Sequence, residues 1–246
     1  MDGKRVAVVT GASSGIGAAT VRRLRHEGFA VIAGARRFDQ LREVAEPAGA
    51  HALPLDVTDR PSVEAFCAQV PRCDVLANNA GGAFGLEPLA EAVDDHWRRM
   101  WESNVFGLML MTRALLPKLI DSGAGHIVNI GSIAGIEVYP GGSGYTSAKH
   151  GVRAITETLR LELLGKPVRV TEIDPGMVET EFSVVRFGGD RERAAKVYEG
   201  MQPLTADDVA DCIAWCVTRP PHVNIDHMVV RPLAQATARD VARDLG

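Results

Sequence analysis

The sequence predicts an α/β protein with one doubly wound parallel sheet of seven strands and helices on both of its faces. Short apolar segments that are typical of buried strands alternate with segments of helical period. Such alternation implies parallel strands joined by right-handed crossover helices. The length of 246 residues and the hydrophobic content of 46% fit one large α/β domain or two small ones. Because no linker, repeat or low-complexity segment divides the chain, we expect a single domain over residues 1–246.

Seven apolar segments are predicted to form the strands. They are residues 5–9, 30–35, 51–57, 73–81, 125–132, 168–174 and 223–232. The predicted helices cover residues 18–28, 38–49 with a break near Pro47, 60–70, 94–121, 144–165 and 205–220. Ser143 and Thr205 are expected to be the N-caps of the last two. Residues 94–121 are apolar on nearly every face, which predicts one long helix that is buried in a core or between subunits.

A glycine-rich turn follows the first predicted strand and leads into a helix. It holds Gly11, Gly15 and Gly17 in the spacing G-x-x-x-G-x-G, with Ser13, Ser14 and Ile16 between them. At such a turn the free backbone N–H groups and the helix dipole face a bound phosphate. A side chain at the glycine positions would block a pyrophosphate. The alternative is a tight turn without a ligand, but the strand–turn–helix context favours dinucleotide binding.

Two arginines follow the second predicted strand, where NAD-binding Rossmann enzymes place an acidic residue for the ribose 2′-OH. Here the chain has Ala35, then Arg36 and Arg37. Guanidinium groups suit a 2′-phosphate, so the sequence favours NADP over NAD. The alternative is a pair of solvated arginines at a helix start. Asp56 and Asn79 lie at the ends of two other strands, where ligands bind in open α/β sheets.

Ser132, Tyr145 and Lys149 are the candidate catalytic residues. Tyr145 and Lys149 stand at i and i+4 of a predicted helix and therefore share a face. A free phenol titrates near pH ~10, but an ammonium within reach lowers its pKa and makes it a usable acid and base. A nearby serine hydroxyl can hydrogen-bond the substrate oxygen on which charge develops. The alternative is a surface tyrosine and lysine that share a helix face by chance.

Asn104 lies within the apolar 94–121 segment, and a buried amide needs partners. It is either a structural asparagine bonded to backbone or an amide that bends the helix and holds a water near the site. Residues 181–203 lack a clean period and contain several glycines, which predicts a mobile lid with a short helix. Within it, Arg186 is a candidate partner for a substrate carboxylate, although a solvated arginine is an equal alternative.

Composition excludes several classes of function. The net charge is −4 without long runs of like charge, so we expect neither a nucleic-acid surface nor a membrane patch. No signal peptide or long apolar stretch is present, which predicts a cytoplasmic protein. The scattered histidines and the cysteine spacings match no metal site, so no metal is expected and the four cysteines are interpreted as reduced thiols.

Several motifs occur in one order along the chain. They are TGASSGIG at residues 10–17, NNAG at 78–81, Asn104, Ser132, Tyr145 with Lys149, and PGMVET at 175–180. Together they resemble the short-chain dehydrogenase/reductase family, and the resemblance covers essentially the whole chain. It implies a seven-stranded Rossmann fold and hydride transfer with NADP(H). It also implies a catalytic tetrad of Asn104, Ser132, Tyr145 and Lys149, in which Ser132 and Tyr145 contact the substrate and Asn104 holds a relay water.

The same resemblance implies roles in cofactor binding. Lys149 would hold the nicotinamide ribose, the Val178 backbone and Thr180 the carboxamide, and Asp56 the adenine. The implied cofactor-binding set is Gly11, Ser13, Ser14, Gly15, Ile16, Gly17, Arg36, Arg37, Asp56, Val57, Asn79, Tyr145, Lys149, Pro175, Gly176, Val178 and Thr180. The family also implies a homodimer or homotetramer through the 94–121 and 144–165 helices.

The last third of the chain resembles the NADP-dependent 3-hydroxy-acid dehydrogenases, which act on serine-like hydroxy acids and malonic semialdehyde. The substrate is therefore expected to be a small carbonyl or alcohol, such as a 3-hydroxy acid or a semialdehyde. Two alternatives stay open. One is a carbonyl reductase for other ketones or aldehydes, and the other is a non-catalytic dinucleotide-binding regulator on the same fold.

Overall fold

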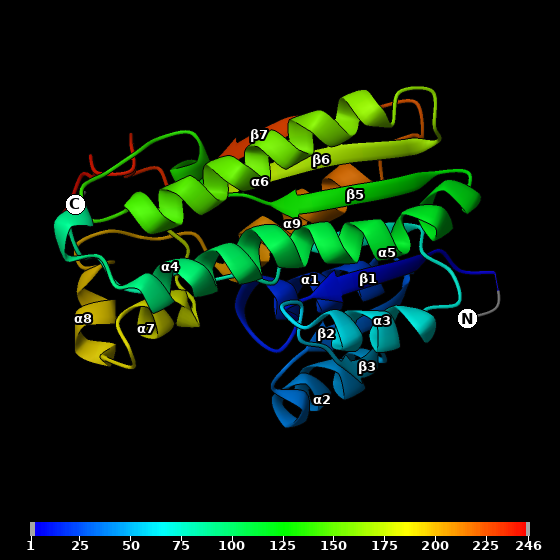
Figure 1. The fold of residues 1–246 in the computed structure, drawn as a ribbon, viewed down its shortest axis with the longest axis horizontal. Helices are drawn as coiled ribbons and strands as arrows, with labels where there is room; N and C mark the ends of the chain where they lie inside the picture. The colour runs from blue at the N-terminus through cyan, green and yellow to red at the C-terminus, as the bar shows by residue number, and fades with distance from the viewer. Residues whose placement is uncertain (1–2, 245–246) are drawn as a thin grey trace.

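The structure is a computed structural model that describes residues 3–244. Its centre is a seven-stranded sheet in the order β3-β2-β1-β4-β5-β6-β7, and every neighbouring pair is parallel. The strands are β1 (Val6–Thr10), β2 (Ala30–Ala35), β3 (His51–Pro54), β4 (Val75–Asn78), β5 (Gly125–Ile130), β6 (Val168–Pro175) and β7 (His227–Val230). Figure 1 shows the strands and the helices that connect them. The predicted fold class is confirmed.

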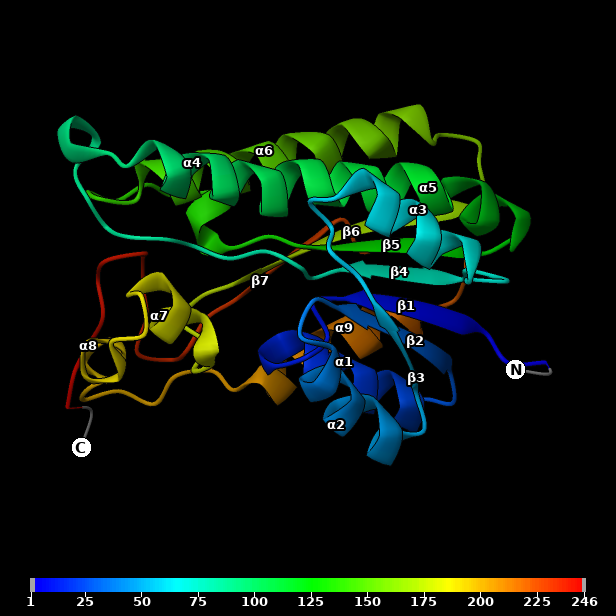
Figure 2. The ribbon, with the colours of Figure 1, turned by 60° about the horizontal axis from the view of Figure 1, so that its bottom comes forward.

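Helices cover both faces of the sheet. They are α1 (Gly15–His26), α2 (Phe38–Ala48), α3 (Arg60–Ala68), α4 (Asp94–Trp101), α5 (Gly107–Asp121), α6 (Ser143–Glu162), α7 (Glu181–Arg186), α8 (Arg191–Lys196) and α9 (Ala206–Val217). Figure 2 shows α1, α2 and α9 on one face and α3, α4, α5 and α6 on the other. Each face has its own apolar core, because the inner strands β1, β2, β4 and β5 are buried on both sides.

The sequence predicted one continuous helix over residues 94–121. The structure shows an interrupted one. A π-helical turn, Glu102–Phe106, separates α4 from α5. The cause is Asn104, whose Nδ2 donates to the Met100 carbonyl and to the Gly82 carbonyl, each at 2.8 Å. A side chain that competes for a helix carbonyl opens the regular i to i−4 ladder.

This helical rod is also not buried on every face within one chain. Phe106 is 54% exposed, and Trp101 and Met109 are only partly covered. The apolar composition therefore does not reflect a helix enclosed by its own core. It leaves an uncovered apolar stripe on the outer face of the molecule.

Three helix ends test the expected boundaries. Pro47 does not break α2, which continues through it to Ala48, and Gly49 ends the helix in the left-handed conformation at φ +66°. Ser143 is the first residue of α6 and not its N-cap, which is Gly142. Thr205 does cap α9, since its hydroxyl accepts from the Asp208 N–H at 3.2 Å while Asp208 bonds back.

The segment 181–203 contains two short helices, α7 and α8, where the sequence predicted one. It lies at the end of the molecule toward which the strands point, beside the C-terminal segment (Figures 1 and 2). The C-terminal segment packs on its own chain, because the Met177 N–H donates to Gln235 at 2.8 Å and the Asp244 N–H to the Gly200 carbonyl at 2.7 Å. No helix in residues 3–244 has the length and apolar character that a membrane span requires.

Candidate active site

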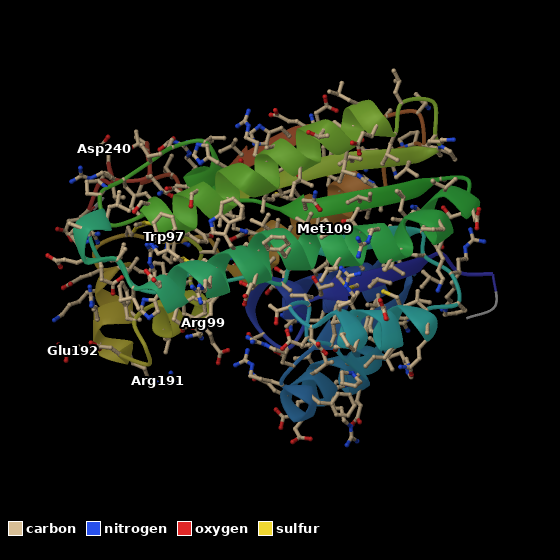
Figure 3. The ribbon with its side chains drawn as sticks, in the orientation of Figure 1. Trp97, Arg99, Met109, Arg191, Glu192 and Asp240 are labelled. Atoms are coloured by element: carbon tan, nitrogen blue, oxygen red, sulfur yellow. The ribbon has the colours of Figure 1, made fainter. Side chains whose placement is uncertain are left out.

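A cavity of about 870 Å³ opens at the carboxyl ends of the strands. Every predicted site residue lines it except Gly17. Segments distant in the sequence form its walls, because parallel strands bring the loops that follow them to the same edge of the sheet. Figure 3 labels Arg99 of α4 and Arg191 and Glu192 of α8 at this end of the molecule, with Trp97 on the side of α4 that meets α6. The predicted residues are therefore brought together by the fold.

The turn after β1 is held in a shape that leaves space for a ligand. Gly11 and Gly15 have φ of +65° and +53°, a region that suits glycine. Asn79 fastens the turn, because its Nδ2 donates to the Thr10 carbonyl at 2.9 Å and to the Gly11 carbonyl at 3.2 Å. The Ser14 side chain does not cap α1, so the first N–H groups of the helix remain available to an anion.

Gly17 does not face the cavity, and its role is in packing. A Cβ atom at this position would lie 2.3 Å from the Gly11 carbonyl oxygen and 2.5 Å from Asn79 Nδ2. The helix can approach the glycine turn this closely because residue 17 has no side chain. Gly17 therefore serves the packing of α1 against the turn, whereas Gly11 and Gly15 line the cavity.

Arg36 and Arg37 both lie exposed at the rim of the cavity. Arg37 is already paired, because its Nη1 lies 2.9 Å from Glu181 Oε2 and its Nη2 lies 2.7 Å from Ser14 Oγ. Both the ion pair and the Ser14 hydroxyl lower the pKa of the Glu181 carboxyl. The arginine end of the cavity is therefore linked to the first residue of α7.

The other predicted cofactor residues lie along the cavity wall. Asp56 accepts from the Thr58 N–H at 2.9 Å and from the Thr58 hydroxyl at 2.7 Å, while Val57 packs beside Gly107. Thr180 caps α7 by accepting from the Phe182 N–H at 3.2 Å. Pro175, Gly176 and Val178 form the chain between β6 and α7.

Tyr145 and Lys149 share one face of α6 and are both buried. The Lys149 ammonium lies 5.8 Å from the centre of the Tyr145 ring and donates to the Ile130 carbonyl at 2.8 Å. Ser132 follows β5, and its hydroxyl accepts from the Ala134 N–H at 3.1 Å. Asn104, whose Oδ1 is buried and has no hydrogen-bond partner among residues 3–244, completes the predicted tetrad around the cavity.

Burial controls the protonation of these groups. It raises the pKa of Tyr145, while the Ser132 hydroxyl and the Arg186 guanidinium act in the opposite direction. Burial lowers the pKa of Lys149 to about 8, against the carboxylates of Asp174 and Glu172. Arg186 is thus one positive charge that favours the Tyr145 phenolate in this structure. The expected effect of Lys149 on the tyrosine stays a prediction.

Arg186 of α7 reaches the tyrosine from the lid side. Its guanidinium lies 5.7 Å from the centre of the Tyr145 ring, with Nε donating to the Gly85 carbonyl at 3.0 Å and Nη1 to the Tyr139 hydroxyl at 3.1 Å. Its Nη2 is buried and has no hydrogen-bond partner within the described residues. A buried guanidinium N–H without a partner is costly, which indicates that an acceptor belongs there.

Several residues near the site were not predicted from the sequence. Gln235 of the C-terminal segment lines the cavity and is 5% exposed. Glu172 and Asp174 lie buried behind Ser132. A signal for the two carboxylates was present in the sequence, because charged residues in a strand that is buried on both faces need partners. Gln235 carried no such signal, since its segment has no periodic pattern.

Comparisons with known proteins agree with this geometry. A family model of short chain dehydrogenases matches residues 5–187. The chain is 60% identical to an uncharacterized oxidoreductase of Mycobacterium tuberculosis H37Rv, over 96% of this chain and 94% of the relative. It is 43% identical to an NADP-dependent 3-hydroxy acid dehydrogenase of Salmonella typhi, over 95% of this chain and 97% of the relative. The closed form of a serine dehydrogenase complexed with NADP+ matches with a TM-score of 0.92 and 42% identity, over 95% of this chain and 97% of that one.

Proposed function

Because this chain belongs to the short-chain dehydrogenase family, we propose that it is an NADP-dependent oxidoreductase that interconverts a small 3-hydroxy acid and its carbonyl form. The observation that carries this proposal is the placement of Tyr145 beside Ser132 and beside the unpartnered Nη2 of Arg186. These groups offer a proton donor, a hydroxyl for the reacting oxygen and a cation for a carboxylate around one part of the cavity. Its location in the cytoplasm stays a prediction from the sequence.

The cavity fits a dinucleotide with a 2′-phosphate. Gly11 and Gly17 leave no room for a Cβ atom, so the chain there forms a close backbone cradle at the start of α1. Arg36 and Arg37 lie at the rim of the same cavity and would face the 2′-phosphate. Residues 175–180 and Lys149 would hold the nicotinamide half of the dinucleotide. The NADP-dependent relative and the NADP+ complex of the structural neighbour support this assignment.

The chain's own residues perform the proton chemistry in this proposal. The bound nicotinamide supplies or accepts a hydride at the substrate carbon. Tyr145 donates its proton to the carbonyl oxygen in reduction and removes the hydroxyl proton in oxidation. Ser132 hydrogen-bonds the same oxygen and orients it. Lys149 stabilises the tyrosinate and holds the ribose, and Asn104 holds a water that connects Lys149 to solvent.

The substrate class follows from Arg186. Its free Nη2 lies in a buried position next to Tyr145, so a carboxylate that bonds it would bring a neighbouring carbon toward the tyrosine. Arg186 ends α7, which lies in the proposed lid over residues 181–203. Closure of the lid on the carboxylate would exclude water from the site. The 3-hydroxy acid and serine dehydrogenases among the similar proteins support an acidic substrate.

The uncovered apolar stripe on the outer helices supports assembly of identical subunits. Phe106 of the π-turn and Leu161 of α6 are 54% and 77% exposed, and Leu164 just after α6 is 86% exposed. Monomers rarely expose apolar side chains of this size along neighbouring helices. We propose that segments 94–121 and 144–165 meet their copies in a homodimer or homotetramer.

The role of Tyr145 is tested by Tyr145→Phe. We expect loss of the proton donor to reduce kcat by at least about 100-fold, while the Kd for NADPH stays within about twofold. The measurements are steady-state kinetics and fluorescence titration with NADPH. Ser147→Ala is the matched control, because it removes a hydroxyl from the same helix that faces Trp101. A Tyr145→Phe enzyme with most of its turnover would contradict the assignment.

Cofactor preference is tested by replacing Arg36 and Arg37 with Ala. We expect the KM for NADPH to rise by about 10-fold or more and the KM for NADH to change little, because the 2′-phosphate is the only part of the cofactor that the guanidinium groups would contact in this proposal. Arg42→Ala is the control, since Arg42 pairs with Glu46 on the outer face of α2. Equal effects on both cofactors would argue against the 2′-phosphate role. Glu181→Gln removes the charge that pairs with Arg37 and should lower the KM for NADPH.

The substrate class is tested by Arg186→Ala, with oxidation of 3-hydroxy acids and of neutral alcohols of similar size. Loss of the carboxylate partner should raise the KM for the acids by about 10-fold or more and leave that for the alcohols nearly unchanged. The control is Arg193→Ala, because Arg193 stacks on Phe187 elsewhere in the lid. An unchanged KM for the acids would remove the idea of an acidic substrate.

Assembly is tested by sedimentation. We expect a dimer or tetramer for the natural chain and a smaller species for Phe106→Arg, because a charge would be buried in the interface. A stable monomer of the natural chain at micromolar concentration would contradict the proposed interface.

A further inference from the structure

Two carboxylates lie buried behind the candidate catalytic residues. Glu172 and Asp174 of β6 are 1% and 0% exposed. Burial of a carboxylate is costly unless it is paired and hydrogen-bonded, and an apolar side chain would fill such a position in a strand more simply. The proposed acid–base chemistry does not by itself use these two residues. Their positions relative to the site therefore require an explanation.

Asp174 makes two contacts that connect Ser132 to the surface. Its Oδ1 accepts from the Ser132 backbone N–H at 2.8 Å. Its Oδ2 lies 2.7 Å from Nε2 of His227, the first residue of the edge strand β7. The His227 side chain is 30% exposed, so the ring extends from the buried carboxylate to the solvent. The carboxylate thus holds the catalytic serine on one side and is held by histidine on the other.

Gly131 allows the carboxylates to come this close. A Cβ atom at this position would lie 1.9 Å from Asp174 Oδ1 and 2.6 Å from Glu172 Oε1. On the other side, Lys149 Nζ donates to the Ile130 carbonyl at 2.8 Å. The Ile130 carbonyl is therefore held by an ammonium, and the Ser132 N–H two residues later by the Asp174 carboxylate. A charge-assisted hydrogen bond fixes backbone geometry more firmly than a neutral one.

The same carboxylate acts on the titrating groups of α6. Burial lowers the pKa of Lys149 to about 8, and the charges of Asp174 and Glu172 oppose that shift. Burial raises the pKa of Tyr145, and Asp174 adds to that shift. Burial and the neighbouring Asp174 carboxylate also raise the pKa of Glu172 to about 8, while Lys149 and Arg153 oppose the change. Asp174 thus bonds the same chain segment that Lys149 bonds, and its charge raises the pKa of both proposed proton-transfer groups.

We propose that Asp174, held in place by His227, is a positioning residue of this enzyme, which fixes the Ser132 backbone and supplies the negative charge that faces Lys149. The kinetic consequences of this inference rest on the proposed function. Its electrostatic consequences do not, because they concern only the charges around Lys149. Asp174 does not touch the substrate; it acts through Ser132 and Lys149. His227 acts one step further out, through Asp174.

The electrostatic part is tested by NMR titration of Lys149 in the full chain labelled with 13Cε-lysine, which contains five lysines. Removal of the Asp174 charge makes the buried ammonium less favourable, so Asp174→Asn should lower the Lys149 midpoint by about 1 pH unit or more. Lys149→Met assigns the signal. Asp226→Asn is the matched control, because Asp226 lies one residue before β7 with its carboxylate largely exposed. An unchanged midpoint in Asp174→Asn would overturn the inference.

The positioning part is tested by kinetics. His227→Leu leaves Asp174 Oδ2 without its partner and should reduce kcat by about 10-fold or more, with the KM for NADP+ within about twofold. His227→Gln keeps an N–H donor and should restore most of the rate. In Asp174→Asn, the rise of the oxidation rate with pH should move to lower pH, because the lost charge had raised the pKa of both proton-transfer groups. A His227→Leu enzyme with the natural rate, or an unmoved pH profile, would contradict the positioning role.

These readouts separate this inference from the proposed function. If the natural chain oxidised no alcohol in the presence of NADP+, the proposed function would fail, while the lysine titration would still decide whether Asp174 sets the charge state of Lys149. If Asp174→Asn does not fold, its two contacts are tested by His227→Leu, whose replaced side chain lies at the surface of the edge strand.

Discussion

Gly11 and Gly17 lie so close to the Asn79 side chain that neither position has room for a Cβ atom. This contact joins the turn after β1 to the chain after β4 and brings the N-terminus of α1 to the edge of the sheet. The Asn79 amide completes it with two hydrogen bonds to carbonyl groups of the turn. The direction of the helix dipole and the floor of the cavity both depend on this approach.

The opposite half of the site depends on burial. Tyr145 and Lys149 are enclosed by α6, β5 and α7, and their pKa values move away from those of free side chains for that reason. The charges that modulate them come from different elements, Arg186 from the lid and Asp174 from β6. The pKa of Tyr145 therefore depends on the position of α7, which carries Arg186, and on the buried Asp174 carboxylate behind Ser132.

Much of the fold and the site could be predicted from the sequence. The strand and helix alternation determined the sheet, and parallel strands necessarily collect the residues that follow them at one edge. Two predictions about helix continuity were wrong. Asn104 opened a π-turn in a helix that looked continuous, and α2 runs through Pro47 and ends one residue later. Neither outcome can be predicted from apolar periodicity. That pattern indicates which face of a helix is buried, but it does not indicate which side chains compete for backbone hydrogen bonds.

The sequence by itself determined the fold class, the phosphate turn and the tyrosine–lysine pair, because each is local or periodic along the chain. The partners of these groups were decided by tertiary structure alone. Arg37 pairs with Glu181 across 144 residues, Arg186 bonds Gly85 across 101, and Asp174 meets His227 across 53. Such contacts depend on how loops and strands are placed by the packed core. Groups so distant in the chain interact only because folding brings them within hydrogen-bond distance, since the electrostatic energy falls as their separation grows.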